Sequence, residues 1–121
     1  MKLDFDSDKP IYLQIAEQIE DAIFTGIYAE ETQIPSTTEI SMTYKVNPAT
    51  VLKGMNILVD EKIIYKKRGV GMFVSEGALE AVKEKRQNNF FQNYIESLIN
   101  EAKKLGLTKD DILKLIERGF K

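Results

Sequence analysis

The sequence predicts an α+β fold that is mainly helical, and three observations lead to this class. Apolar residues recur at helical spacing in several separate stretches of the 121-residue chain. Side chains that cap helix starts precede three of these stretches. One pair of short runs rich in β-branched and aromatic residues flanks a turn that contains glycine. The expected order is therefore three helices, a β-hairpin, and a helical tail.

The first predicted helix follows Pro10 and ends at Thr25-Gly26, where Gly26 can take a left-handed conformation. Its apolar residues repeat with the spacing of a single helical face, and they are Tyr12, Ile15, Ala16, Ile19, Ala22 and Ile23. The acidic residues of this stretch lie off that face. We interpret the helix as a scaffold whose apolar face packs in the core.

Two further helices carry strong start signals. Ser36 and Glu39 have the spacing of a capping box, which predicts a helix over about 37–44. Asn47 can cap the next helix, over about 48–60, and Pro48 suits its first position. A brief turn separates the two helices, so the pair predicts a helix-turn-helix over about 37–56.

A β-hairpin is predicted directly after the second of these helices. Ile63–Lys67 and Met72–Val74 form its strands, and Arg68-Gly69-Val70-Gly71 forms a tight tip. A helix-turn-helix followed by such a hairpin is a winged helix-turn-helix, here over 9–77 with its wing over about 63–75. In this arrangement the helix that begins at Pro48 is the one expected to enter the DNA major groove.

The charge distribution agrees with this interpretation. The net charge is −2, yet Tyr44–Gly71 carries six Lys or Arg against two acidic residues. Met1–Thr43 carries two Lys against nine acidic residues. Only the middle segment favours a polyanion, and it contains the helix expected in the groove. An ordinary local excess of surface lysines is an equally good explanation of the charge alone.

Several classes of site are not expected. Cysteine and histidine are absent, which argues against zinc sites of the usual type and against Ser-His or Cys-His nucleophilic arrangements. The paired acids at 30–31 and 110–111 fit a loop and a helix start better than catalysis. We therefore expect no enzyme, no metal and no cofactor. No apolar run is long enough to span a bilayer and the first residues lack a signal-peptide core, so a cytoplasmic location is expected.

The tail, over 78–121, is predicted to contain two helices. One runs from about Ala78 to Lys104, and the second begins after Thr108, which can cap it. Both carry more apolar surface than they can bury against each other. The tail must therefore pack on the winged helix or on a second chain.

Four short motifs together resemble one family. They are Pro10-Ile11-Tyr12-Leu13-Gln14-Ile15, Ile34-Pro35-Ser36, Ile63-Ile64-Tyr65, and Arg68-Gly69-Val70-Gly71-Met72-Phe73-Val74. In this order and spacing they resemble the DNA-binding domain of the GntR family of bacterial transcription regulators. Asn47-Pro48-x-Thr50-Val51 and the short tail are similar to the YtrA subfamily, in which the tail serves dimerisation. The resemblance covers about residues 9–76.

The resemblance implies which residues contact DNA, with the wing tip in a minor groove beside phosphates. The DNA-binding residues expected from it are Ser36, Thr37, Thr38, Asn47, Ala49, Thr50, Lys53, Lys66, Lys67, Arg68, Gly69, Val70 and Gly71. Many family members carry Arg where this chain has Thr38, Pro48 and Leu52, and Gly where it has Lys62. Each expected contact also has a purely structural explanation: a helix surface for the threonines, a cap for Asn47, and a solvated strand edge for the wing cations.

For the tail, the resemblance implies a homodimer. The expected interface residues are Phe90, Phe91, Tyr94, Ile95, Leu98, Ile99, Ile112, Leu115 and Ile116. A small-molecule effector site among the aromatic residues is the alternative.

The function expected is that of a homodimeric regulator, a repressor in the first instance, on a palindromic DNA operator. Genes for ABC transporters often lie beside regulators of this subfamily. A winged helix that binds protein without reading DNA is the other interpretation, and the acidic composition and few base-reading groups favour it slightly. Gel shifts at several salt concentrations distinguish the two.

Overall fold

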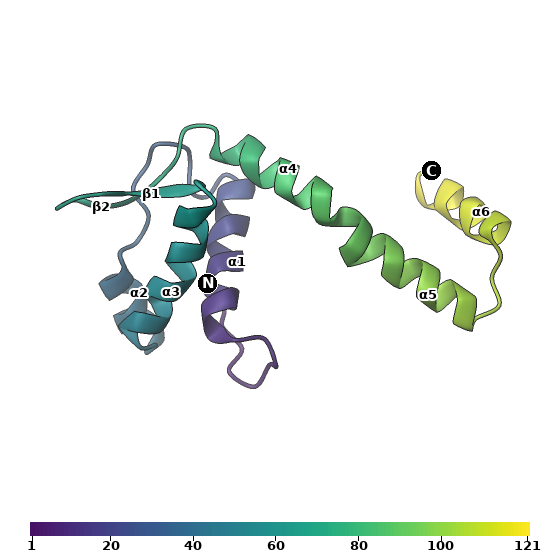
Figure 1. Ribbon diagram of the computed structural model, residues 1–121, viewed down its shortest axis with the longest axis horizontal. Helices are drawn as coiled ribbons and strands as arrows, with labels where there is room; N and C mark the ends of the chain where they lie inside the picture. The colour runs from purple at the N-terminus through teal and green to yellow at the C-terminus, as the bar shows by residue number, and fades with distance from the viewer. The chain divides into compact units, whose positions relative to one another are not determined.

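A computed structural model describes all residues from 1 to 121 (Figure 1). Its elements, in chain order, are α1 (Ile11–Phe24), α2 (Thr37–Tyr44), α3 (Pro48–Asp60), β1 (Ile64–Lys67), β2 (Gly71–Val74), α4 (Ala78–Phe90), the π-helical turn η1 (Phe91–Ile95), α5 (Glu96–Lys104) and α6 (Lys109–Gly119). The predicted class, mainly helical with one small hairpin, is confirmed. The chain forms two compact units, Met1–Glu84 and Lys85–Lys121. No helix is long and apolar enough to cross a membrane.

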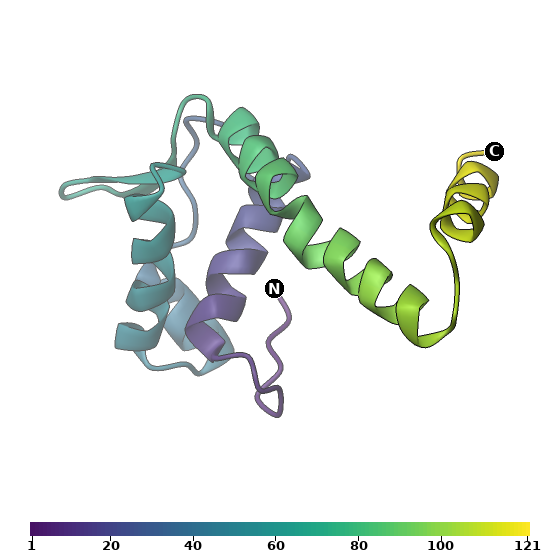
Figure 2. The same ribbon diagram turned by 45° about the vertical axis from the view of Figure 1, so that its right-hand side comes forward.

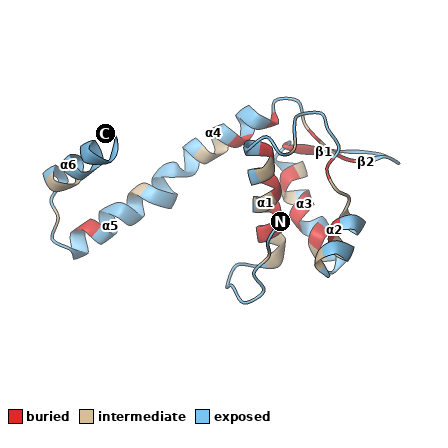
Figure 3. Ribbon diagram, turned by 180° about the vertical axis from the view of Figure 1, so that it is seen from behind, coloured by how far each residue is buried: buried red, intermediate tan, exposed pale blue.

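The core of the first unit lies where α1 and α3 pack together, with α2 and the hairpin around them (Figure 2). Gly54 makes this close packing possible, because a Cβ on it would lie 2.6 Å from the backbone oxygen of Tyr12. The largest fully buried side chains are Ile15, Ile19, Val51, Met55, Leu58, Ile63, Ile64, Val74 and Val82. In Figure 3 the buried residues of this unit accordingly gather on α1, α3 and the strands.

The helix-turn-helix has the bounds that its caps predict. The Ser36 hydroxyl accepts the Glu39 N–H at 3.0 Å, and the Glu39 carboxylate accepts the Ser36 N–H at 3.2 Å. The Asn47 side-chain oxygen accepts the Ala49 N–H at 2.8 Å. Between the helices Lys45 takes a left-handed conformation, with φ +56°. The predicted helices over 37–44 and 48–60 are thus confirmed.

The predicted hairpin is confirmed too, with β1 and β2 antiparallel and Tyr65 opposite Phe73. The free edge of β2 pairs with a short extended segment that lies between α1 and α2 in the chain. The Ile34 N–H donates to the Met72 carbonyl at 2.9 Å, and Gln33 forms a bridge with Phe73. This third partner anchors the base of the wing to the helical core.

The start of α4 belongs to the first unit. Ala78 and Val82 are buried in its core, so the compact unit extends beyond residue 77, the end expected for the winged helix. Glu30, from the loop after α1, caps this helix: its two carboxylate oxygens accept the N–H groups of Gly77 at 2.7 Å and Leu79 at 3.1 Å. A carboxylate in this place is also favoured by the helix dipole.

The second unit contains the helical turns from Lys85 onward and α6. The predicted regular helix from Ala78 to Lys104 is wrong in one detail, because η1 interrupts the α-helical hydrogen bonding and the Glu96 N–H donates to the Phe91 carbonyl. A π turn inserts one extra residue, so apolar periodicity before and after it is out of phase. The aromatic rings of Phe90 and Tyr94 lie beside this turn with centroids 5.4 Å apart.

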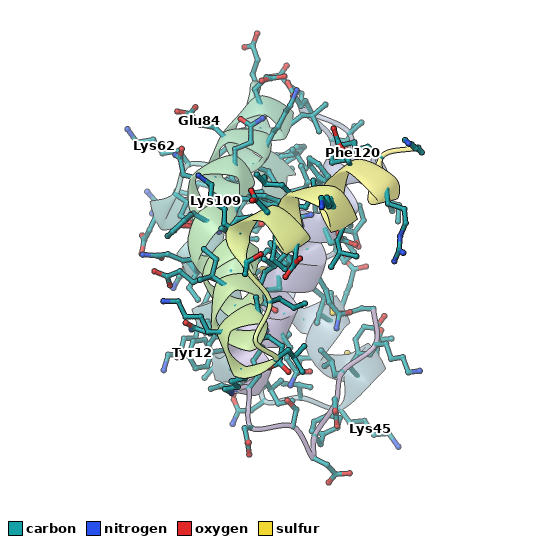
Figure 4. The ribbon with its side chains drawn as sticks, turned by 90° about the vertical axis from the view of Figure 1, so that its right-hand side faces the viewer. Tyr12, Lys45, Lys62, Glu84, Lys109 and Phe120 are labelled. Atoms are coloured by element: carbon teal, nitrogen blue, oxygen red, sulfur yellow. The ribbon has the colours of Figure 1, made fainter.

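The last helix, α6, begins at the cap that the sequence predicts. The Thr108 hydroxyl accepts the Asp111 N–H at 3.1 Å, and the Asp111 carboxylate accepts the Thr108 N–H at 2.9 Å. These bonds from Thr108 lower the pKa of Asp111. Figure 4 labels Lys109 and Phe120 at the two ends of this helix.

Candidate nucleic-acid interface

Three elements of the first unit carry the residues expected to contact DNA: the start of α2, the exposed face of α3, and the β1–β2 hairpin. Thr38, Asn47, Ala49 and Lys53 are exposed on the two helices. All residues from Lys66 to Val70 are exposed on the hairpin. Exposure is a requirement for contact, and these residues meet it.

At the start of α2, two of the three expected residues are engaged within the protein. Ser36 is half-buried and its hydroxyl serves the capping box. Thr37 is half-buried as well, and its hydroxyl lies 3.4 Å from the sulfur of Met55. Of the three, Thr38 is the exposed one.

The start of α3 presents few polar groups to solvent. The Asn47 side-chain oxygen is taken by the cap, which leaves its NH2 group as a donor. Thr50 is half-buried. Ala49 and Leu52 are exposed, and Leu52 has 45% of its surface accessible. The outward face of this helix start is therefore mostly apolar.

The single cation of α3 is directed toward α1. The Nζ atom of Lys53 lies 4.1 Å from the centre of the Tyr12 ring. A cation over an aromatic ring at this distance is attracted by the ring quadrupole, by about 0.5–1 kcal/mol at an exposed site. Lys53 thus remains exposed but has a preferred position beside the start of α1, where Tyr12 lies. Figure 4 labels Tyr12.

The hairpin tip is a tight turn held from outside the hairpin. The Val70 N–H donates to the Lys67 carbonyl at 2.9 Å, and Gly69 has φ +78°, which suits glycine. The Gln33 side chain donates to the Val70 carbonyl at 3.0 Å. A Cβ at position 71 would lie 2.5 Å from the Gln33 amide nitrogen, and Gly71 has φ +146°. Glycine at 71 and Gln33 together keep the tip in one place.

The wing cations lie on both faces of the hairpin. Lys66 and Lys67 are consecutive strand residues, so their side chains leave the strand on opposite faces. The Lys67 ammonium lies 5.2 Å from the Phe73 ring centre, and that ring stacks on Tyr65 with centroids 5.8 Å apart. Arg68 follows at the exposed tip. The wing therefore offers three positive charges, one of them positioned by an aromatic pair.

The residues expected at a dimer interface lie in the second unit and form an apolar surface. Phe90, Phe91, Tyr94, Leu98, Ile99, Leu115 and Ile116 are exposed, and Ile95 and Ile112 are half-buried. Between α5 and α6 there is an open apolar cavity of about 400 Å³. Its lining residues are Leu98, Glu101, Ala102, Leu105, Leu107, Ile112, Leu115 and Ile116. Four of the nine expected residues share this cavity.

Four residues near the interface were not expected from the sequence to take part in it. Tyr12 positions Lys53, Gln33 holds the wing tip, and Phe73 lies under Lys67. The first three meet their partners only through tertiary folding, so no local signal marks them. Leu52 did carry a signal. It lies off the apolar face that Val51, Met55 and Leu58 form at helical spacing, at a position where a polar residue is usual.

The structure brings together no group of three or more His, Cys, Asp or Glu side chains that could hold a metal ion.

Comparison with known proteins places these elements in a family. The model of the family described as "Bacterial regulatory proteins, gntR family" matches residues 11–74. The uncharacterized HTH-type transcriptional regulator YhcF of Bacillus subtilis is 32% identical over 93% of this chain and 92% of its own. The HTH-type transcriptional repressor YtrA of the same organism is 29% identical over 97% of this chain and 89% of its own.

Solved structures agree in fold. A transcriptional regulator from Oenococcus oeni has a TM-score of 0.84 and 27% identity, and the match covers 100% of this chain and 99% of that one. The structure of AraR(DBD) in complex with operator ORX1 has a TM-score of 0.56 and 27% identity, over 62% of this chain and 93% of that one. These relatives are transcription regulators and not enzymes. The chain belongs to the GntR family of bacterial regulatory proteins and is a YtrA-like DNA-binding transcription regulator.

Proposed function

We propose that this regulator is a homodimeric repressor that binds a palindromic operator in the cytoplasm. The observation that carries the proposal is the combination of an exposed α3 face with three exposed wing cations, Lys66, Lys67 and Arg68, in one compact unit. A helix for the major groove and a charged hairpin beside it are the two parts a winged helix needs. The repressor YtrA, similar over nearly the whole chain, supports the direction of regulation.

The proposed contacts divide by chemistry. Thr38, Asn47, Ala49 and Thr50 face base edges in the major groove, where Ser36 and Thr37 fix the start of α2. Lys53, Lys66, Lys67 and Arg68 neutralise phosphates, while Gly69, Val70 and Gly71 let the wing tip enter the minor groove. The operator complex of AraR(DBD), whose match covers 62% of this chain, supports DNA as the ligand of this unit.

The proposed dimer forms through the second unit. One winged helix contacts few base pairs, and two that are joined gain affinity through effective concentration. Two-fold symmetry requires half-sites about 34–36 Å apart, or a multiple of that distance, on one DNA face. The apolar side chains around the α5–α6 cavity supply the surface for an isologous contact. A small-molecule effector in that cavity is a competing occupant, and control of an ABC transporter operon is the proposed physiological role.

Fluorescence anisotropy with the whole protein tests the proposal. The probes are a fragment from upstream of the protein's own gene and a scrambled fragment of equal length, each at several salt concentrations. We expect tighter binding to the upstream fragment and a linear fall of log affinity with log salt. Equal, weak binding to both fragments at low salt would contradict sequence-specific regulation and favour a winged helix that binds protein. The genes that flank this one test the transporter assignment.

A further inference from the structure

The start of α3 presents an exposed apolar surface. Ala49 and Leu52 are exposed there, one helical turn apart, and Leu52 has 45% of its surface accessible. Residues three apart in a helix lie on neighbouring parts of one face. Burying an exposed leucine is favourable only against another apolar group. An apolar group on the surface that α3 meets is therefore the best match for these two residues.

The polar groups nearby do not change this character. Lys53, the single cation of α3, has its ammonium 4.1 Å from the Tyr12 ring centre, on the side of α1. The Asn47 side-chain oxygen is taken by its bond to Ala49. Asn56, exposed further along the helix, is of the type that pairs with adenine. No arginine lies on α3 to form the two parallel bonds that select guanine.

One base-edge group in the major groove is apolar, and it is the C5-methyl group of thymine. We propose that Leu52, supported by Ala49, is a specificity-determining residue that packs on thymine methyl groups, so that each half-site carries thymine opposite the first turns of α3. The inference rests on the proposed function and names the base chemistry that the operator must offer. It predicts A·T pairs where a helix with arginine in this place would take G·C.

The test uses methyl-group deletion in DNA. The operator is first selected from random duplexes by the full-length protein. Each thymine of the selected half-site is then replaced by deoxyuridine, which removes the methyl group and leaves all hydrogen-bonding groups. We expect one or two positions at which affinity falls roughly fourfold per methyl group, the value of one apolar carbon removed from water. Replacement of thymines that do not face α3 should leave the affinity unchanged.

Two variants assign the effect to a residue. In Leu52→Ala the thymine and deoxyuridine operators should bind alike, because the group that senses the methyl is gone. Leu79→Ala is the matched control, because Leu79 has a similar accessible fraction, 43%, but lies on α4. It should keep the fourfold preference. Leu52→Arg should shift selection at the same position toward guanine.

The outcomes separate the inference from the function on which it rests. Specific operator binding with equal affinity for thymine and deoxyuridine at every position would overturn the inference and leave the proposed function intact. A methyl preference that survives in Leu52→Ala would assign it to another residue and overturn the inference as well. Failure to select any sequence would overturn the proposed function, and the inference with it.

Discussion

The Lys53 ammonium on α3 lies 4.1 Å from the ring centre of Tyr12 on α1, so the one cation of α3 is positioned by the first helix. At Gly54, the next residue, the two helices pack so closely that a Cβ would meet the Tyr12 carbonyl oxygen. Close helix packing and the ring contact therefore occur in the same place. In the proposed complex with DNA, we therefore expect Lys53 to meet phosphates at the edge of the groove and not bases on its floor.

Lys53→Ala should weaken binding to all DNA sequences by a similar factor. Because phosphate contacts position a protein without reading sequence, the slope of log affinity against log salt should fall by about one. Anisotropy titrations against the selected operator and single-base variants measure both quantities. Lys83→Ala, an exposed lysine on α4, is the control and should leave the slope unchanged. A loss of about 1–3 kcal/mol confined to one operator position would show a base contact instead.

Arg68→Ala should also weaken binding without relaxing specificity, since Arg68 lies at the exposed tip of the wing. The expected loss grows as salt is lowered, because screening by salt weakens the interaction of the arginine with phosphate. A competition series with operator and scrambled duplexes at two salt concentrations measures it. Arg118→Ala, on α6, is a control outside the first unit. Unchanged affinity at low salt for the Arg68 variant would remove the wing from the interface.

Lys62→Gly should stabilise the protein by about 0.5–1 kcal/mol, the left-handed penalty of a side chain less the extra freedom of glycine in the unfolded chain. Lys62 follows α3 with φ +61°, and Figure 4 labels its side chain. Thermal unfolding followed by circular dichroism measures the change. Lys62→Ala is the matched control, because it removes the charge but keeps the Cβ. Equal gains in both variants would mean that charge, and not backbone conformation, limits stability here.

The backbone conformation of Lys62 accounts for a preference of the family at this position. The related family tends to have glycine where this chain has Lys62, and the left-handed φ gives the physical reason for that preference. The Lys62 N–H donates to the Val59 carbonyl at 2.9 Å, and the Ile63 N–H to the Leu58 carbonyl at 2.9 Å. These bonds close the end of α3 in the manner of a glycine cap. These backbone hydrogen bonds thus hold Lys62 in a left-handed conformation, which is unfavourable for a residue with a side chain.

Helix bounds were predictable from the sequence because their causes are local. The boxes at Ser36 and Thr108 each act over three residues, and Pro48 fixes its own backbone. Such signals do not depend on tertiary structure, and so both α2 and α3 begin where the caps place them. The hairpin followed from its short β-branched runs and the glycines of its tip in the same way.

The positions of the site residues depend on contacts between distant parts of the chain and could not be predicted. Nothing near Gln33 indicates that it bonds to Val70, and nothing near Glu30 indicates that it caps α4. The π turn also left no signal in the sequence, because the seven residues 83–89 before it are all polar and give no apolar phase to compare with that of the residues after it. Sequence therefore predicted the bounds of these elements better than it predicted which way their side chains lie.

Leu98→Asp should give a monomer with an intact winged helix. Leu98 lines the cavity between α5 and α6 and is 37% exposed, and we expect the proposed dimer to bury it. An aspartate in that position places an unpaired charge in an apolar contact, which is strongly unfavourable. Sedimentation at micromolar concentration measures the oligomeric state, and the far-ultraviolet circular dichroism of the whole protein reports whether its helices are intact.

Leu113→Asp is the matched control for this variant. Leu113 lies on α6, is 50% exposed, and is outside the cavity lining, so its variant should remain dimeric. The Leu98 variant should lose operator affinity together with the dimer, because a single winged helix no longer gains from a linked partner. If the wild type sediments as a monomer and yet binds a full operator with undiminished affinity, the second unit has another role. The α5–α6 cavity would then be open to an effector, and Leu98→Asp would change ligand binding while leaving DNA affinity unaltered.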